Sequence, residues 1–475
     1  MQASDSFSGY LSDVTFPDRF HRELSPAWLN YASVLGGASP KALDRPFRYL
    51  DLGCGFAYST IVNAAAYPHA EFHACDLNPA HIEAASRRAT RLGVRNVAFH
   101  EASFEALLER DLPAFDFIVL HGIYSWVDAD VRRVVRQLVA ERLAEEGLVY
   151  LSYNCQPGWS AEAPLRKLML ELAQAAPGDV EARTGSAIAR MQALGTPSFR
   201  YFRDNPAVAD ALSALAASPL DYLAHEYLNG TWEIHYSVDV IDDMARAGLA
   251  YTGSATLADN HPTLLMDRQA AEAMAALPNA RLRHLAEDFA VNRRFRRDVF
   301  VRGGRTGRSQ AQALQALEEI SIGCASEIER IDIRATIPRG VLSFQPEFIA
   351  DLRGLMQQGS MRIGEIVGQL GGEGRNPREI LQNLLFLVAG GILTPFARAG
   401  GYNAAGARRA VNASAAAALA ASAADAGNAY VPSELVGNGV ALGADEAAQA
   451  LQWIAGDQTV PCPARLARLG VLCGT

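Results

Sequence analysis

The chain has 475 residues, with 43 basic and 52 acidic side chains and a formal net charge of −9. Its charged fraction of 20% and hydrophobic fraction of 49% are ordinary for a globular protein, which argues against global disorder and against a basic nucleic-acid-binding protein. Six cysteines lie far apart without a CxxC pair, which favours neither a zinc site nor a disulfide framework and suits a reducing cytoplasm. No signal-peptide pattern and no membrane-spanning apolar run is found, so we expect a soluble, cytoplasmic protein with no membrane insertion.

The first part of the chain alternates strand and helix patterns. Predicted strands cover residues 47–51, 70–76, 97–101, 115–120 and 147–153, and predicted helices cover 58–67, 79–92 and 128–143. Near-continuous apolar strands separated by helices require a parallel sheet with helices on both faces. The fold class is therefore α/β, with a doubly wound sheet.

A helical region interrupts this sheet. Residues 157–236 are predicted to be a helical insert. Two later strands, at 249–256 and 299–302, are predicted to lie at the edge of the same sheet and bring its total to seven strands. The sheet domain is thus split into residues 1–156 and 237–303. Every expected cofactor residue lies before residue 123, so the sequence predicts that residues 310–475 are dispensable for cofactor binding.

The rest of the chain is predicted to be mainly helical. In a middle domain at 304–400, helices at 361–370 and 377–388 and a strand at 392–396 are typical of a winged helix. Five arginines face five acids over residues 341–400, so phosphate binding has little driving force and no nucleic-acid partner is expected. Residues 401–475 are predicted to form a further small C-terminal domain.

A glycine turn follows the first predicted strand. Asp51-Leu-Gly53-Cys-Gly55 places two glycines where a ligand can approach the backbone, and Asp76 ends the next strand, positioned to accept ribose hydroxyls. A dinucleotide fold would need GxGxxG and a pyrophosphate at the helix start, whereas this turn reads GxGxA behind an acid. The acid Asp51 would repel pyrophosphate and favours a cationic ligand.

This turn, together with Asp76, resembles the first two motifs of class I S-adenosylmethionine (AdoMet) methyltransferases. The resemblance implies a seven-stranded class I methyltransferase sheet and AdoMet as cofactor. It implies that Asp51 and the glycines hold the methionine end and that Asp76 takes the ribose. Ser103 stands where the family usually has an Asp against adenine, and its hydroxyl can accept the same hydrogen bond. The expected cofactor-binding residues are Asp51, Gly53, Gly55, Tyr58, Asp76, Leu77, Ser103, Phe104, His121 and Gly122.

A closer resemblance covers roughly residues 10–400. The motifs that carry it are Phe16-Pro17, Ser25-Pro26, Leu120-His-Gly-Ile-Tyr-Ser-Trp126, Tyr153-Asn-Cys-Gln-Pro-Gly-Trp159, Tyr222-Leu-Ala-His-Glu-Tyr-Leu228, Ala247-Gly-Leu-Ala-Tyr251 and Phe295-Arg-Arg-Asp298. They resemble methyltransferases that carry a methyltransferase regulatory domain, among them the rickettsial protein lysine methyltransferases. The resemblance implies a helical dimerisation insert, hence a homodimer, and later domains that bind a protein substrate.

The methyl acceptor is expected at the carboxyl ends of the strands. The catalytic residues are predicted to be Tyr124, Trp126 and Tyr153, as walls of an acceptor channel, and Asn154, which would orient the incoming amine. Tyr10, Ser125 and Trp159 are predicted substrate-binding residues. Ordinary packing between sheet and helix stays open as the alternative for Trp126 and Tyr153, and a hydrogen-bonded turn residue ahead of Pro157-Gly158 stays open for Asn154. His225-Glu226 invites a zinc interpretation, but position 229 is Asn, so a structural His-Glu pair is favoured and no metal is expected.

The sequence therefore predicts an AdoMet-dependent methyltransferase that acts on a protein side-chain amine, most simply lysine. Methylation of a small molecule on oxygen, nitrogen or carbon is the alternative within enzymes. A non-catalytic AdoMet-binding interaction module is the alternative from another class, and the aromatic loop at 124–126 argues against it.

Overall fold

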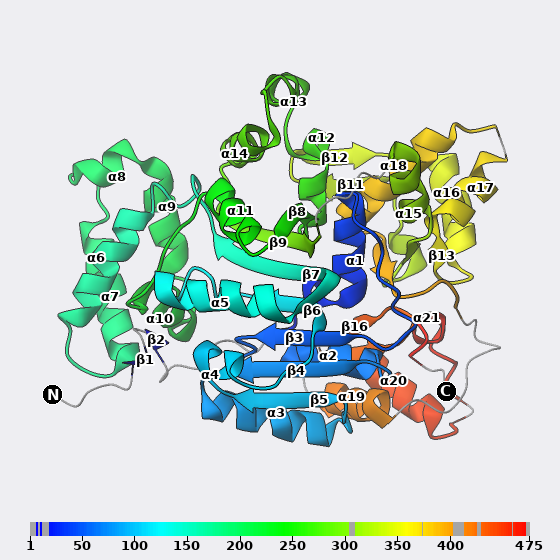
Figure 1. The fold of residues 1–475 in the computed structure, drawn as a ribbon, viewed down its shortest axis with the longest axis horizontal. Helices are drawn as coiled ribbons and strands as arrows, with labels where there is room; N and C mark the ends of the chain where they lie inside the picture. The colour runs from blue at the N-terminus through cyan, green and yellow to red at the C-terminus, as the bar shows by residue number, and fades with distance from the viewer. Residues whose placement is uncertain are drawn as a thin grey trace.

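The computed structural model describes residues 6–7, 10–11, 19–303, 309–372, 374–401, 413–424, 429–457 and 459–471. A seven-stranded sheet stands at its centre, with the strand order β5-β4-β3-β6-β7-β9-β8 (Figure 1). The strands are β3 (Arg48–Leu52), β4 (Glu71–Asp76), β5 (Val97–Glu101), β6 (Phe115–Leu120), β7 (Leu143–Asn154), β8 (Leu249–Ser254) and β9 (Phe295–Arg302). Strand β9 runs antiparallel to both of its neighbours, whereas β3 to β7 pair in parallel. The predicted doubly wound α/β sheet is confirmed, with β8 and β9 at its edge.

Alternating side chains of the strands build two apolar layers. Tyr49 packs into one layer with α1 (Pro26–Leu35), α2 (Tyr58–Ala66) and α3 (Pro79–Arg91). Its neighbour Leu50 packs into the other, which contains α4 (Phe104–Leu108), α5 (Ala129–Arg142) and α11 (Ser237–Ala245). Successive strand residues point to opposite faces, so both faces of this buried sheet carry apolar side chains.

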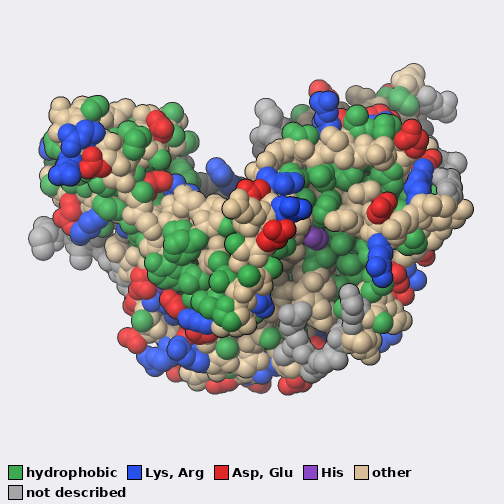
Figure 2. Space-filling view, turned by 90° about the horizontal axis from the view of Figure 1, so that it is seen from above, with side chains coloured by type: hydrophobic (Ala, Val, Ile, Leu, Met, Phe, Trp, Pro, Cys, Tyr) green, Lys and Arg blue, Asp and Glu red, His purple; other side chains and the backbone are tan. Residues whose placement is uncertain are grey.

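The insert stands apart from the sheet as a helical lobe (Figures 1 and 2). It packs around its own apolar cluster, which includes Trp159, Leu165, Met191, Leu212 and Leu223. Its helices are α6 (Ala163–Gln174), α7 (Val180–Leu194), α8 (Arg200–Asp204), α9 (Pro206–Leu215) and α10 (Leu220–Leu228). In Figure 1 the carboxyl ends of β3 and β4 point towards this lobe.

The segment between β8 and β9 and the region after β9 are mainly helical. The former holds η2 (Leu257–Asn260), α12 (Pro262–Leu265), α13 (Arg268–Ala275) and α14 (Ala280–Ala290). After β9 come α15 (Gln310–Glu318), β10 (Ser321–Gly323), η3 (Ile328–Arg330), β11 (Arg334–Ile337), β12 (Gly340–Ser343), α16 (Pro346–Met356), β13 (Met361–Arg362), α17 (Ile363–Gly371), α18 (Pro377–Ala389) and β14 (Thr394–Phe396). The two expected helices are α17 and α18, and β14 joins the three-stranded sheet β13-β10-β14.

The C-terminal unit packs directly on the sheet domain. It consists of α19 (Ala413–Ala424), the hairpin of β15 (Ala429–Ser433) and β16 (Asn438–Leu442), α20 (Ala444–Ile454) and α21 (Ala464–Arg468). The hairpin covers α2, and Phe20 stacks on Tyr430 with ring centroids 4.1 Å apart. The Tyr58 hydroxyl accepts a 3.1 Å hydrogen bond from the Tyr430 backbone. Since Tyr58 is an expected cofactor residue, this contact removes the basis for calling residues 310–475 dispensable for cofactor binding.

At the other end of the chain, the short strands β1 (Ser6–Phe7) and β2 (Tyr10–Leu11) pair with each other, and η1 (Arg22–Leu24) leads into α1. Among the described residues, no helix is both long and apolar enough to cross a membrane.

Candidate active site

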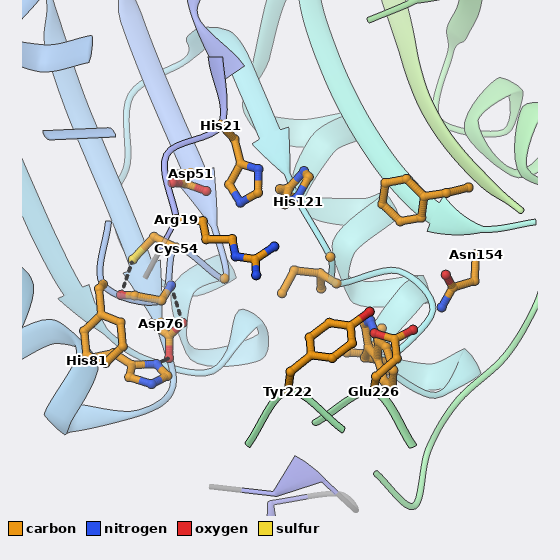
Figure 3. Close-up of a pocket in the computed structure, with 18 of the residues that line it drawn as sticks. Arg19, His21, Asp51, Cys54, Asp76, His81, His121, Asn154, Tyr222 and Glu226 are labelled. Atoms are coloured by element: carbon orange, nitrogen blue, oxygen red, sulfur yellow. Dashed lines mark hydrogen bonds and ion pairs between the residues drawn. The ribbon is translucent and has the colours of Figure 1, made fainter. Parts of the chain in front are cut away.

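A cavity of about 1070 Å³ is lined by residues at the carboxyl ends of β3, β4, β6 and β7 and by residues of the insert. All ten expected cofactor residues line it, as do Trp126, Asn154 and Trp159 from the expected acceptor side. Segments far apart in the sequence meet here, as Figure 3 shows for Asp51 and Asp76 on one side and Tyr222 and Glu226 on the other. We call the two parts the cofactor side and the acceptor side.

On the cofactor side, Asp76 fixes the glycine turn to the end of β4. Its Oδ2 accepts a 2.8 Å hydrogen bond from the Gly55 backbone, and its Oδ1 accepts one of 2.9 Å from the Asn78 backbone. His81 lies 3.2 Å from the same Oδ1. The carboxylate is thereby held at the cavity wall, where its remaining acceptor capacity suits ribose hydroxyls.

Asp51 lies deeper, near the end of β3, with 4% of its surface exposed. Burial raises the pKa of its carboxyl to about 7, although Thr60 donates a short hydrogen bond to Oδ2 that opposes the shift. A buried carboxylate with this pKa is stabilised by a nearby cation. The ammonium group of a methionine moiety would supply that charge.

Two glycines leave open space on the cofactor side of the cavity. Gly55 and Gly122 have left-handed backbones, with φ of +53° and +68°, and a Cβ at either position would meet no atom within 4 Å. Both line the cavity, so they form a cradle that side chains would fill. Gly53 differs, because a Cβ there would lie 2.2 Å from Ile123 Cδ1. A side chain at position 53 would therefore have to displace Ile123, and the φ of +75° at Gly53 also favours glycine.

The remaining cofactor residues surround this cradle. Tyr58 begins α2, Leu77 follows β4, and Ser103 and Phe104 begin α4. The Ser103 hydroxyl accepts a 3.2 Å hydrogen bond from the Ala106 backbone and so caps α4. It can still donate its own hydrogen to a ligand in the cavity.

His121 stands directly after β6 and is held in place by its neighbours. Its Nδ1 lies 2.8 Å from the Tyr150 hydroxyl, and its ring centroid lies 3.9 Å from that of His21. Burial, with the positive charges of His21 and Arg297 as smaller causes, lowers the pKa of His121 well below its usual value. The ring is therefore neutral at neutral pH and does not repel a sulfonium.

An N-terminal strap, residues 19–25, completes the cofactor side, and sequence reasoning missed it. Arg19, His21 and Leu24 line the cavity, and Figure 3 shows the Arg19 guanidinium extending into it. Within the described part of the chain, no hydrogen bond or ion pair of Arg19 is found. A guanidinium beside the cradle suits a carboxylate. The sequence signals were the motif at 16–17, which lies just before the strap, and the motif at 25–26, which lies at its end.

His21, Glu23 and His121 could hold a metal ion, because one donor atom from each lies within 4.8 Å of the others. Arg297 already contributes a positive charge there, with its Nε 2.9 Å from Glu23 Oε1. The expectation that the chain holds no metal stays a prediction.

On the acceptor side, the structure separates the predicted residues into two groups. Asn154 ends β7, and its side chain faces the cavity together with Trp126 and Trp159. The prediction that Tyr124 and Tyr153 wall the channel is wrong. Both are buried under the sheet layer, and their hydroxyls donate 2.6 Å hydrogen bonds to Asp243 and Asp298.

Ser125, a predicted substrate-binding residue, does not line the cavity, because it is buried with 1% of its surface exposed. Its hydroxyl accepts a 2.9 Å hydrogen bond from the Asn154 backbone, so it positions Asn154 from behind. Tyr10 lies in β2, but its side chain is outside the described part of the structure, as is that of His225.

Sequence reasoning missed most of the acceptor side. The insert supplies Tyr222, Glu226 and Tyr227 from α10 and Glu162 from just before α6, and the segment before β9 supplies Arg294. The motifs at 222–228 and 295–298 marked these segments, but no spacing rule connects them to the glycine turn. Only the folded chain brings them together.

Comparisons with known proteins agree with this geometry. A family model described as a methyltransferase domain matches residues 50–149, and one described as a predicted methyltransferase regulatory domain matches residues 219–302. The uncharacterized protein sll1526 of Synechocystis sp. is 32% identical over 387 residues, which cover 82% of this chain and 76% of that protein. The uncharacterized protein RP789 of Rickettsia prowazekii is 32% identical over 146 residues, 31% of this chain and 26% of that protein.

Among solved structures, PKMT2 from Rickettsia typhi in complex with AdoHcy is similar, with a TM-score of 0.69 and 18% identity. The similarity covers 91% of this chain and 87% of that one, so the fold is shared along nearly the whole length.

The sheet order, the glycine turn and the acid that ends β4 define a protein that binds AdoMet and transfers its methyl group. The chain belongs to the class I AdoMet-dependent methyltransferases with a methyltransferase regulatory domain, in the same family as the Synechocystis protein.

Proposed function

We propose that this methyltransferase acts on the side-chain amine of a lysine in a protein substrate. The observation that carries the proposal is the acceptor side of the cavity, which is lined by the rings of Trp126, Trp159 and Tyr222 together with Asn154. Aromatic faces attract an alkylammonium group and pack on its aliphatic stem. The resemblance of the sequence motifs to the rickettsial protein lysine methyltransferases supports the same acceptor.

When bound, AdoMet supplies the methyl group as an electrophilic carbon on a sulfonium. The residues of this chain then have to bind and orient AdoMet and the acceptor and to exclude water. An in-line displacement needs this alignment more than it needs covalent chemistry by the protein. Asp76 would hold the ribose, and the glycine cradle at Gly55 would hold the methionine end. Neutral His121 adds no positive charge next to the sulfonium, and Asn154 would orient the amine.

The acceptor has to be a neutral amine when it attacks. Deprotonating a lysine at pH 7 costs about 4.6 kcal/mol, because its reference pKa is about 10.4. Burial beside the sulfonium lowers that pKa and offsets part of the cost. An enclosed, partly aromatic chamber therefore favours the reaction.

The proposal is tested by incubating the pure protein with methyl-labelled AdoMet and a cell extract. We expect label in protein, released as methyl-lysine by acid hydrolysis. Self-labelling is easy to subtract, because the chain has only two lysines, Lys41 and Lys167. The Asp76→Asn variant serves as the cofactor-defective control. Label found only in small molecules would contradict a protein substrate.

The homodimer and the cytoplasmic location are also proposals. Leu168 and Phe199 on the insert are 40% and 48% exposed, which supports a contact between two lobes. Light scattering of the pure protein should give twice the monomer mass. A monomer at micromolar concentration would contradict the dimer. The five described cysteines are all free thiols, which suits the cytoplasm.

A further inference from the structure

One acid of the acceptor side has no assigned role. Glu226 belongs to α10 of the insert, and Figure 3 shows its carboxylate beside Tyr222, across the cavity from the cofactor residues. In the sequence it is the second residue of the His-Glu pair that suggested a metal or a structural contact. The fold instead directs it into the cavity that holds the reaction.

Among the described residues, Glu226 has no countercharge of its own. No hydrogen bond or ion pair of its carboxylate is found among the described residues, and its nearest positive charges are otherwise engaged. Arg166 donates to the backbone oxygens of Glu226, at 3.2 Å, and Asn229, at 2.7 Å, and its guanidinium lies over Trp232. Arg294 donates two hydrogen bonds to Glu162, one of them 3.0 Å long.

The contrast between Glu162 and Glu226 is informative. Both acids line the cavity, but Arg294 neutralises Glu162, whereas Glu226 faces the open space. Burial raises the pKa of Glu226, with Arg166 and Arg294 opposing the shift. An uncompensated, largely buried carboxylate is costly unless a ligand supplies the opposite charge.

The surroundings of Glu226 indicate which cation fits. Tyr222, one helical turn earlier, and Tyr227 line the cavity beside it, with Trp126 and Trp159 nearby. Rings around a single carboxylate suit a primary alkylammonium, whose stem is apolar and whose head carries one charge. A neutral hydroxyl or carbon acceptor would leave the carboxylate without its partner.

We propose that Glu226 is the residue that receives the acceptor's ammonium group and selects an amine over a neutral acceptor. The inference rests on the proposed methyltransferase site and deepens it. The ammonium transfers one proton to the Glu226 carboxylate, and the freed nitrogen lone pair attacks the methyl carbon while the carbon–sulfur bond breaks. The sulfur keeps the bonding electron pair, the positive charge passes to the methylated nitrogen, and Glu226 later releases its proton to water.

The test measures binding, so that it does not depend on knowing the substrate. The AdoHcy-saturated protein is titrated with n-butylammonium, which mimics a lysine side chain, and with 1-butanol as its neutral counterpart, and both are followed by ligand-observed NMR. We expect the wild-type protein to bind n-butylammonium at least about tenfold more tightly than 1-butanol. Glu226→Gln should lose that preference, and Glu226→Asp should keep part of it.

Glu181→Gln is the matched control, because Glu181 is an exposed acid on α7 of the same insert. Its n-butylammonium affinity should stay within about twofold of the wild type. AdoHcy affinity should be unchanged in every variant, which shows that each is folded.

Equal binding of the two probes by the wild type would overturn the proposal even if Glu226→Gln fails to fold. An n-butylammonium affinity that survives in folded Glu226→Gln would also overturn it. The result is independent of the labelling experiment. If Glu226 binds the probe but no methyl-lysine forms, the amine selection stands and the protein-lysine acceptor falls.

Discussion

The two sides of the cavity are built in different ways. The glycine cradle and the acids Asp51 and Asp76 come from one stretch of about 70 residues, at the carboxyl ends of adjacent parallel strands. The acceptor side is assembled from the end of β7, the insert and the segment before β9. A cofactor shared by a whole class can be bound by a local motif, whereas an acceptor requires surfaces that only the complete fold brings together.

The N-terminal strap and the C-terminal hairpin complicate this contrast. Ser25 Oγ donates a 2.6 Å hydrogen bond to the Gly437 carbonyl, and Asn438 Nδ2 donates one of 3.0 Å to the Arg22 carbonyl. The strap is thus fixed by residues more than 400 positions away. Part of the cofactor side also depends on the whole chain.

The largest effect is expected from ending the chain at Gly401. This removes β15 and β16 from α2 and leaves Phe20 without its stacking partner Tyr430. We expect AdoHcy binding and the cooperative thermal transition to be lost together, because buried apolar residues such as Val431 and Val440 belong to the same core as α2. Calorimetry on the purified fragment checks this. A fragment with wild-type AdoHcy affinity would show that the cofactor side is local after all.

The next largest effect is expected from Gly55→Leu. A side chain there would enter the space of the methionine end and weaken AdoHcy binding at least about 100-fold, or about 2.8 kcal/mol. Gly248→Leu is the matched control, since Gly248 has a φ of +78°, no atom near its Cβ position and no place in the cavity. Equal AdoHcy affinities of the two variants, measured by calorimetry, would contradict the cradle.

Asp76→Asn should weaken AdoHcy binding by about 1 to 3 kcal/mol, because it removes a charged acceptor from the ribose hydroxyls. The amide also disturbs the hydrogen bond from Gly55, so the turn loosens at the same time. The exposed Asp111→Asn should bind as the wild type does. Unchanged calorimetric affinity in folded Asp76→Asn would refute the ribose assignment.

A pH series tests Asp51. Because burial raises the pKa of Asp51 to about 7, lowering the pH protonates this carboxylate in the ligand-free protein and removes its negative charge. AdoHcy affinity should therefore fall as the pH is lowered, by roughly eightfold between about pH 7.5 and about pH 6. Asp51→Asn should bind more weakly at about pH 7.5 and lose this dependence. Identical pH profiles for both proteins would exclude Asp51 as the group that meets the ammonium.

The smallest effect is expected from Arg19→Ala. If the guanidinium meets the ligand's carboxylate, its removal should weaken AdoHcy binding about fivefold, or about 1 kcal/mol, since a largely exposed ion pair is screened by water. The loss should shrink as salt is added. Arg45→Ala, at another exposed arginine, should have no effect. A salt-independent loss would indicate that Arg19 supports the strap and does not bind the ligand.

The sequence predicted the sheet, and the residues that it assigned to the cofactor line one cavity, because strand periodicity and the Asp51 to Gly55 turn are local signals. It failed for Tyr124 and Tyr153, which stand next to true cavity residues but point to the other face of the layer. Alternation along a strand turns neighbours in opposite directions, so one step of register separates Tyr153 from Asn154. Arg19 and Glu226 could not be assigned, because tertiary packing alone brings them to the cavity.

A crystal structure with AdoHcy and n-butylammonium bound tests the two-sided cavity most directly. We expect the ribose hydroxyls on Asp76, the homocysteine end between Asp51 and the Gly55 cradle, and the ammonium on Glu226. The AdoHcy sulfur should face the n-butylammonium without protein between them. AdoHcy bound outside this cavity, or with its sulfur turned away from Glu226 and Asn154, would refute this assignment of the two sides.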